Sequence, residues 1–204
     1  MTNYQKVVDF NKTFGVKIYD KADSTLFDID SKLVSYRMAL NKEEFRELND
    51  AVKQNDSVEA IDAILDILYV VYGMGCSFGY NMDDVMRELE FEGAGLDQTC
   101  FQLTKQFNVS SGIQNMVGFN LDENKEIVTF HINTIGESMK ELDQFVDAKD
   151  MEKVIITLSK LLKVVYSMGV SFNIDVDYGF NLVHESNMSK VCVNEAEAIK
   201  TVQY

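Results

Sequence analysis

The sequence predicts an all-α protein, a helical bundle made of two tandem repeats that pack against each other as a pseudo-dimer. Its 204 residues include no proline, so the strongest breaker of helices is missing. Apolar side chains recur at the three- and four-residue spacing of a helix face in several long segments. Residues 70–78 also match residues 164–172 at seven of nine positions. Such repetition at one fixed offset indicates that one structural unit occurs twice.

The first half predicts four helices joined by short connections. We expect them at about residues 4–14, 27–53, 56–78 and 82–91. Gly15 is a suitable C-terminal stop for the first of them. The long second helix ends at a turn around Asn55, and Asp56 can cap the helix that follows. The glycine-containing stretch from Gly93 to Asp97 is the best candidate for a linker between the two halves.

Three separate blocks of the second half repeat the first half in the same order. Acidic positions align at an offset of 94 residues, and the N-terminal blocks align at an offset of 97. The aligned pairs are Glu43 with Glu137, Glu47 with Glu141, Phe10 with Phe107, Asn11 with Asn108 and Gly15 with Gly112. Two apolar helices can resemble each other by chance, but this agreement of order and spacing favours a duplication. One repeat would cover residues 1–93 and the other residues 98–204.

Carboxylates gather in the hairpin formed by the second and third predicted helices. The acidic positions are Glu43, Glu44, Glu47, Glu59, Asp62 and Asp66. Residues three or four apart share a helix face, so an antiparallel hairpin would bring two acidic stripes opposite each other among apolar neighbours. Carboxylates that face each other in such surroundings repel unless a cation compensates. The pattern therefore favours a hard divalent ion, with Mg²⁺ as the best fit, over the alternative of a solvated acidic face.

The second half has lost this chemistry. At the offset of 94, Glu44, Glu59, Asp62 and Asp66 are replaced by Ser138, Lys153, Ile156 and Lys160. We therefore expect only one metal site in the chain. The second half has instead a tail from His184 to Lys190, which we expect to follow its last helix. This tail contains amide and ammonium groups, whereas the equivalent residues 90–96 of the first half have neither.

The composition limits the partners and the compartment. The net charge of −14 argues against nonspecific binding to nucleic acid or to an anionic membrane, although a nucleotide bound with Mg²⁺ remains compatible. The scattered Cys76, Cys100 and Cys192 indicate buried thiols in a reducing compartment. The N-terminal residues do not resemble a signal peptide, and no apolar run approaches the roughly 18 residues that span a membrane. We expect a cytoplasmic protein.

Three motifs together resemble the all-α nucleoside triphosphate pyrophosphatase superfamily, specifically the MazG-like and phosphoribosyl-ATP-pyrophosphohydrolase-like proteins of its phage and viral branch. The first motif is E-E-x-x-E at 43–47, followed by E-x-x-D at 59–62. The second is F-N-K-T-F-G at 10–15, and the third is V-H-E-S-N-M-S-K at 183–190. Typical members carry the acidic motif and the tail within one repeat and form dimers. This chain places them in different repeats, which predicts a fused pseudo-dimer with one composite site.

The resemblance implies hydrolysis of a (d)NTP to (d)NMP and pyrophosphate, with Mg²⁺ as the cofactor and Mn²⁺ as an alternative. The metal ligands would be Glu44, Glu47, Glu59 and Asp62, with Asp66 as a further ligand or as a neighbouring acceptor. The metal would neutralise developing charge and position a water for attack on the α-phosphorus. Glu44 and Glu47 would thereby belong to the catalytic group. Glu43 is either the general base, a group that orients a ligand, or an ordinary solvent-facing glutamate.

Four residues are candidates for contacts with the substrate. Lys190 suits a phosphate as a compact cation, and Asn187 could bond a base edge, a sugar hydroxyl or a phosphate. Arg37 lies two turns before Glu44 on the same helix face, by helical periodicity. Lys32 lies earlier on that helix. Arg37 and Lys32 would either meet phosphates or pair with acids.

The leading prediction is therefore a nucleotide pyrophosphohydrolase, in viral nucleotide metabolism and the host cytoplasm if the source is viral. The alternative is a catalytically weak nucleotide-binding or interaction protein, because the second site is lost. A phosphoribosyl-ATP hydrolase ranks lower, since no residues indicate a site for the extra phosphoribosyl group. His131 favours a structural role, and the sequence contains no P-loop and no serine-nucleophile motif. The fused pair would be a monomer or a homodimer.

Overall fold

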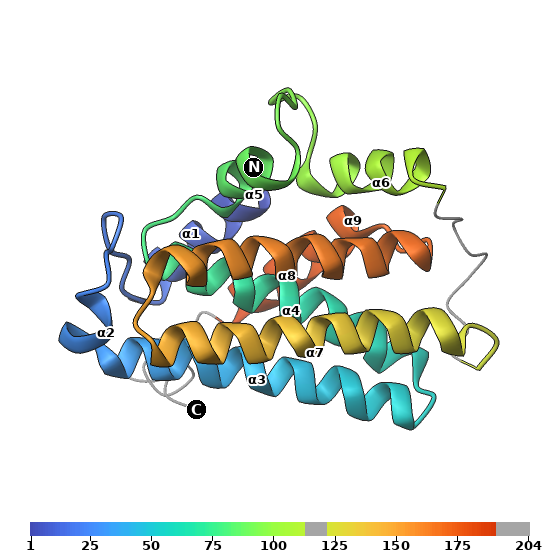
Figure 1. Ribbon diagram of the computed structural model, residues 1–204, viewed down its shortest axis with the longest axis horizontal. Coiled ribbons are helices and arrows are strands. Elements are labelled where there is room, and N and C mark those ends of the chain that lie inside the picture. Colours follow the sequence, from blue (N-terminus) through green and yellow to red (C-terminus); the bar gives the residue numbers. More distant parts are fainter. Residues whose placement is uncertain (113–121, 191–204) are drawn as a thin grey trace.

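The computed structural model describes residues 1–112 and 122–190. Within these residues every regular element is a helix, so the predicted all-α bundle is confirmed (Figure 1). In chain order the helices are α1 Asn3–Thr13, α2 Leu26–Ile29, α3 Ser31–Lys53, α4 Ser57–Ser77, α5 Met82–Glu90, α6 Cys100–Ser110, α7 Lys125–Asp147, α8 Met151–Ser171 and α9 Val176–Ser189.

Two long helical hairpins form the centre of the bundle (Figure 1). α3 packs against α4, α7 packs against α8, and α4 contacts α8, so the two hairpins share one core. α7 also lies beside α3. The last helix of each half crosses to the other half, since α9 packs on α1 and α4 whereas α5 packs on α8 and α6. Each half therefore covers the core of the other, as expected of a pseudo-dimer.

Corresponding helices of the two halves begin at constant offsets. α6 begins 97 residues after α1, and α7, α8 and α9 begin 94 residues after α3, α4 and α5. Capping boxes start both N-terminal helices, with Thr2 and Gln5 at α1 and Thr99 and Gln102 at α6. These offsets equal those of the sequence repeat. A duplication would give such offsets, and the repeat bounds of 1–93 and 98–204 stay a prediction.

Two helix boundaries differ from the expected ones. The helix predicted over 27–53 is interrupted at Asp30, which has φ −141° and accepts a hydrogen bond from the backbone N–H of Leu33 at 3.3 Å. An aspartate side chain can compete with the helix for backbone donors, so α2 ends before Asp30 and α3 begins at Ser31. The tail that was expected to follow the last helix instead forms its end, because α9 continues to Ser189.

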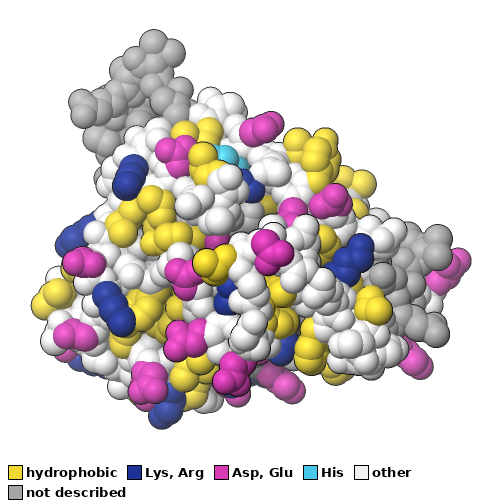
Figure 2. All heavy atoms as spheres, turned by 90° about the horizontal axis from the view of Figure 1, so that it is seen from above, with side chains coloured by type: hydrophobic (Ala, Val, Ile, Leu, Met, Phe, Trp, Pro, Cys, Tyr) yellow, Lys and Arg dark blue, Asp and Glu magenta, His cyan; other side chains and the backbone are white. Residues whose placement is uncertain are grey.

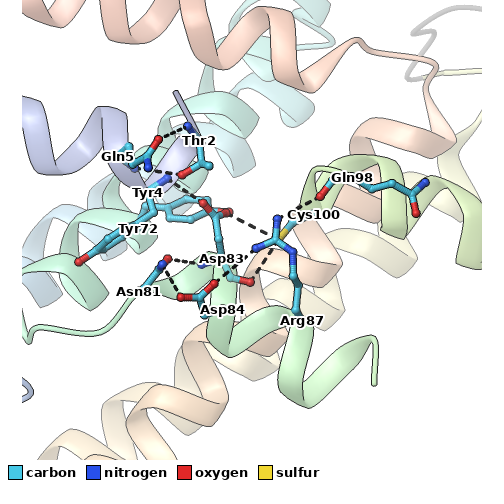
Figure 3. A network of polar contacts seen from close by, with 10 residues as sticks. All are labelled: Thr2, Tyr4, Gln5, Tyr72, Asn81, Asp83, Asp84, Arg87, Gln98 and Cys100. Carbon is cyan, nitrogen blue, oxygen red and sulfur yellow. Dashed lines mark hydrogen bonds and ion pairs between the residues drawn. The ribbon is translucent and has the colours of Figure 1, made fainter. Parts of the chain in front are cut away.

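A buried polar network lies where the two halves meet, and Figure 3 shows the part of it around Asp83. Tyr72 and Tyr166 are fully buried, and their hydroxyls lie 3.0 Å apart. The Tyr72 hydroxyl donates to Asp83 Oδ1 at 2.6 Å, and Asp83 Oδ2 accepts from the backbone N–H of Tyr4 at 3.2 Å. Asn3 Nδ2 donates to the Tyr166 hydroxyl at 3.0 Å. Because polar groups at this depth need partners, the network ties α1, α4, α5 and α8 together.

α4 and α8 are each long and apolar enough to cross a membrane by length and composition, contrary to the sequence-based expectation. Their windows have a mean hydropathy of 1.5, and 83% and 72% of those windows are buried inside the bundle. A helix at the centre of a core is apolar on most of its circumference. Packing between the two hairpins therefore accounts for the composition of both helices.

Candidate active site

A cavity of about 230 Å³ lies between α1, α3, α4 and the end of α9. It forms where the hairpin of the first half meets the last helix of the second half. Its lining includes five of the residues predicted for the site, namely Arg37, Glu44, Asp66, Asn187 and Lys190. Apolar and aromatic side chains complete the walls, among them Phe10, Phe14, Tyr36, Leu40, Tyr69 and Val70. Parts from the two predicted repeats therefore meet in one place.

Glu44 on α3 and Asp66 on α4 are partly buried carboxylates at one end of this cavity. Burial raises the pKa of Glu44 to about 8, and the charges of Asp66, Glu47, Glu43 and Asp62 add to the shift. Burial also raises the pKa of Asp66 to about 6, with a further contribution from Asp62. A carboxyl group keeps its proton to a higher pH when burial removes water from its ionised form and when other negative charges lie nearby. A divalent cation could take the place of the proton.

The other predicted carboxylates stand outside the cavity. The exposed ones are Glu43, Glu47, Glu59 and Asp62. Glu59 is remote from the pair, because it lies two turns before Asp66 near the closed end of the hairpin. Within the part of the chain that the structure describes, no three His, Cys, Asp or Glu side chains form a group that could hold a metal ion. The structure thus brings Glu44 and Asp66 to the cavity, rather than all the predicted carboxylates.

The end of α9 brings Asn187 and Lys190 to the same cavity. The charge of Lys190 lowers the pKa of Asp66 against the effect of burial, and Lys190 Nζ donates to Asn187 Oδ1 at 2.9 Å. Asn187 also hydrogen-bonds the Tyr69 hydroxyl, which lies 3.2 Å from His184 Nδ1. These contacts form because α9 packs on α1 and α4. The tail of the second half therefore reaches the hairpin of the first half.

Arg37 on α3 lies deep in the cavity wall, with 5% of its surface exposed. Its Nε donates to Ser77 Oγ at 2.8 Å, and its Nη2 donates to Asn11 Oδ1 at 3.2 Å. Burial lowers the pKa of Arg37, and none of the ion pairs formed within residues 1–112 and 122–190 involves it. Of the two alternatives left open for Arg37, the structure therefore does not show pairing with an acid. A buried cation without an anionic partner is unfavourable. This arrangement is consistent with a side chain whose partner is a bound ligand.

Lys32 does not join this group. It is exposed in the first turn of α3 and does not line the cavity. Sequence reasoning missed three residues that position the guanidinium, namely Asn11, Ser77 and Gly73. A Cβ atom on Gly73 would lie 2.9 Å from Arg37 Nη1. Asn11 and Ser77 both belong to segments that repeat in the second half, but a repeat gives no sign of a contact with Arg37.

The equivalent positions of the second half make different contacts. His131 replaces Arg37 at the offset of 94, and its Nε2 lies 3.1 Å from Ser171 Oγ. Burial lowers the pKa of His131 to about 4, so a neutral, structural histidine fits this place. Lys163 replaces Tyr69 of the cavity wall at the same offset, and its Nζ lies 2.8 Å from Glu90 Oε2. The positions equivalent to the carboxylates Glu44 and Asp66 hold Ser138 and Lys160, so the second half has no counterpart of that pair.

Two comparisons with known proteins indicate the family of the chain. The phosphoribosyl-ATP pyrophosphohydrolase family matches residues 7–92. An uncharacterised protein of Acanthamoeba polyphaga mimivirus is 36% identical over 203 residues, which cover 100% of this chain and 76% of the viral protein. The chain belongs to the phosphoribosyl-ATP pyrophosphohydrolase-like superfamily. The resemblance that the motifs predicted is thereby confirmed, and the mimivirus relative supports its viral branch. No solved structure matches the chain significantly.

The phosphoribosyl-ATP pyrophosphohydrolase match ends before the second half begins. It therefore includes Arg37, Glu44 and Asp66 but not Asn187 and Lys190. The similarity to the mimivirus protein extends over both groups of residues. Membership in a pyrophosphohydrolase family indicates activity of the nucleotide pyrophosphohydrolase type, that is, hydrolysis of an acid anhydride.

Proposed function

We propose that this protein is a Mg²⁺-dependent nucleoside triphosphate pyrophosphohydrolase that cleaves a (d)NTP to (d)NMP and pyrophosphate. The observation that carries the proposal is the presence of Glu44 and Asp66 with Arg37, Asn187 and Lys190 around one cavity. Carboxylate oxygens suit a hard divalent cation, and lysine and arginine suit phosphates and other acceptors. A triphosphate with its Mg²⁺ is a ligand that needs both kinds of group.

Glu44 and Asp66 fit Mg²⁺ better than a metal that requires a complete protein cage. Mg²⁺ is usually bound through one or two carboxylates and takes its remaining ligands from substrate phosphates and water. Burial raises the pKa values of the two carboxyl groups, and the neighbouring carboxylate charges add to it. A bound cation would offset that repulsion. Glu47 and Asp62, whose charges act on this pair, are further candidate ligands. Mn²⁺ prefers the same oxygen donors and would be an alternative cofactor.

The side chains of the protein would orient the triphosphate for attack of water on the α-phosphorus. When bound, Mg²⁺ would neutralise charge on the phosphate oxygens. Lys190 would contact a phosphate, and Asn187 would hold a phosphate or the sugar through its amide. Glu47 and Glu43, whose charges act on Glu44, are candidates to accept the proton of the attacking water. Water adds across the anhydride, so that (d)NMP and pyrophosphate leave as products.

We further propose that one chain suffices for one complete site. The end of α9 reaches the first hairpin within the same molecule, so a monomeric pseudo-dimer holds all the proposed parts, and a homodimer would keep one site per chain. On the face shown in Figure 2, lysine and arginine side chains stand singly among acidic and apolar ones. With the net charge of −14, this distribution favours a small-molecule substrate over nucleic acid or a membrane. The proposed location is the cytoplasm, of the host if the source is viral.

A second candidate function is nucleotide binding with little turnover. The observation that favours it is the replacement of Glu44 and Asp66 by Ser138 and Lys160 in the second half, because the chain has already lost one possible site. Hydrolysis of phosphoribosyl-ATP, which the matching family is named for, is a further alternative that uses the same bond cleavage.

Release of pyrophosphate from a panel of canonical and modified (d)NTPs and from phosphoribosyl-ATP tests these proposals. We expect release from at least one (d)NTP with Mg²⁺, none with EDTA, and none from Asp66→Asn. The matched control is Lys160→Gln at the equivalent position of α8, which should keep the activity. If no triphosphate is hydrolysed while one of them raises the melting temperature, the binding function replaces the enzymatic one.

A further inference from the structure

We infer that Arg37 reads the base of the substrate and selects bases with a keto oxygen on their outer edge, namely 6-oxopurines and 4-oxopyrimidines. The inference rests on the proposed function, because it takes the bound molecule to be a nucleoside triphosphate. It adds a residue that determines specificity and names the class of (d)NTP that the site prefers.

The cavity has two chemically different ends, about 10 Å apart along the helices that line it. Glu44 and Arg37 are seven residues apart on α3, and Asp66 and Gly73 are seven residues apart on the neighbouring α4. All four residues line the cavity, and the 2.9 Å approach of Arg37 Nη1 to a Cβ on Gly73 shows that these two lie level. The carboxylate end, which Lys190 joins, therefore lies two helical turns from the guanidinium end.

The two ends suit opposite parts of a nucleotide. The carboxylate end, with its lysine, suits phosphates and their cation. Between the ends the walls are apolar, since Leu40 and Val70 stand halfway along α3 and α4. Phe10 and Tyr69 line the same space and pack edge to face, with ring centroids 5.7 Å apart. Such walls suit the faces of a base, so Arg37 at the far end meets the outer edge of the base rather than the phosphates.

Arg37 presents only hydrogen-bond donors at this end, because a guanidinium has no acceptor. Ser77 and Asn11 hold its Nε and Nη2, and Asn11 is itself anchored by donating to Cys76 Sγ at 3.4 Å. These contacts position the group so that Nη1 lies beside Gly73 in the cavity wall. A keto oxygen accepts from such a donor, whereas an exocyclic amino group opposes it with a second donor. Leaving a buried charged donor unpaired is unfavourable, so amino bases are disfavoured.

The test uses substrates that exchange an oxo for an amino group. dITP and dATP differ in this way at position 6 of the purine, and dUTP and dCTP differ at position 4 of the pyrimidine. With the unmodified protein and Mg²⁺, we expect kcat/KM to be at least about tenfold higher for the oxo member of each pair, the effect of one charge-assisted hydrogen bond. Calorimetric binding of the non-hydrolysable α,β-imido analogues should follow the same order without turnover.

Equal affinities within each pair, or a preference for the amino members, would overturn the inference while leaving pyrophosphohydrolase activity intact. Binding without turnover that still favours the oxo analogues would support the inference and contradict the proposed reaction. If none of the four binds, the proposed function fails and the inference fails with it.

Arg37→Lys separates recognition of the base from recognition of a phosphate. Lysine keeps the positive charge but loses the planar fork. We expect the preference for oxo substrates to fall to about threefold or less, with little change for the amino substrates. An equal loss for all four substrates would assign Arg37 to a phosphate and overturn the inference. His131→Gln at the equivalent position of α7 is the matched control and should leave the preference unchanged.

A second variant keeps the test decisive if Arg37→Lys does not fold. Gly73→Ala adds a methyl group that would crowd Arg37 Nη1 and displace it from the cavity wall. Because Nη1 is the far end of a flexible side chain, the arginine can move aside without disturbing the backbone. We expect this variant to remain folded by its melting curve and to lose most of the oxo preference. A folded Gly73→Ala protein with an unchanged preference would contradict the role of Nη1.

Discussion

Tyr72 and Tyr166, 94 residues apart in the sequence, meet at the centre of the bundle with their hydroxyls 3.0 Å apart. They occupy equivalent positions of α4 and α8, but their other partners differ. The Tyr72 hydroxyl donates to Asp83, whereas the Tyr166 hydroxyl accepts from Asn3 Nδ2. The contact joins the two halves into one core, because the hydroxyl pair is held from α1 on one side and from α5 on the other.

Tyr72→Phe should destabilise the protein more than Tyr166→Phe does. The first change removes the 2.6 Å hydrogen bond that the buried Asp83 accepts, which should lower the free energy of unfolding by about 1–3 kcal/mol. The second removes bonds between neutral groups and should cost about 1 kcal/mol. Because the two hydroxyls share one network, the double variant should cost less than the sum. Urea unfolding measures all three values, and strict additivity would show that the hydroxyls do not interact.

Glu44→Gln should stabilise the metal-free protein at alkaline pH. The folded pKa of Glu44 is about 8, above its ordinary value of 4.5, so the folded state binds the proton more tightly than the unfolded state. The stability that this group contributes is therefore fully present below pH 4.5 and is lost as the pH rises through 8. Glutamine stays neutral, so the variant should be more stable at pH 8 by about 1–2 kcal/mol, after allowance for solvent screening of a partly exposed side chain.

Thermal unfolding in EDTA at pH 5 and pH 8 measures this difference. The gain should be much smaller at pH 5, where Glu44 is protonated in the folded protein. The same variant should lose Mg²⁺-dependent turnover, because a neutral amide is a poor ligand for a hard cation. An equal gain at both pH values would mean that a change in packing, and not the charge, is responsible.

Mg²⁺ should bind more tightly as the pH rises from 6 to 8. Asp66 and Glu44 titrate at about 6 and about 8, and a carboxyl group must lose its proton before it coordinates a metal. Binding should therefore release protons into the buffer. Calorimetry at pH 6, 7 and 8, in buffers of different ionisation enthalpy, measures both the affinity and the proton count. An affinity that does not vary with pH would remove this pair from the ligand set.

Lys190→Ala should raise KM for the triphosphate by about tenfold, the effect of losing one charge-assisted contact with a phosphate. The rate constant kcat should change less. Lys32→Ala should leave both parameters unchanged, because Lys32 is exposed at the start of α3 and does not line the cavity. Steady-state kinetics of the two variants makes the comparison. Unaltered kinetics of Lys190→Ala would separate the end of α9 from the site.

Most of the helical framework could be predicted, because its signals are local. Asp56 caps α4 by accepting from two backbone N–H groups, and this role follows from residue type and position. The interruption at Asp30 could have been noticed on the same grounds, since aspartate favours N-caps over helix interiors. The exposure of Glu59 could not, because it depends on how far along α4 the cavity extends.

The candidate site was predictable in its residue types and less so in its geometry. Glu44 and Asp66 share the cavity with Asn187 and Lys190, as expected of a composite site, but Glu47 and Asp62 stand outside it. Helical periodicity assigns a residue to a face and does not say which part of that face a neighbouring helix covers. The burial that raises the pKa of Glu44 comes from this packing.

The sequence by itself determined that the fold class is all-α, that the halves of the chain repeat at offsets of 94 and 97 residues, and that one half kept the acidic motif while the other kept the tail. These properties depend only on residue type and spacing, and the sequence contains both in full. Only the tertiary structure decided that Glu47 and Asp62 stay outside the cavity. It also decided that Arg37 is buried and hydrogen-bonds Ser77 and Asn11, without an ion pair to an acid of residues 1–112 and 122–190. Such contacts join residues far apart in the chain, and they form because two amphipathic hairpins bury more apolar surface together than either does alone.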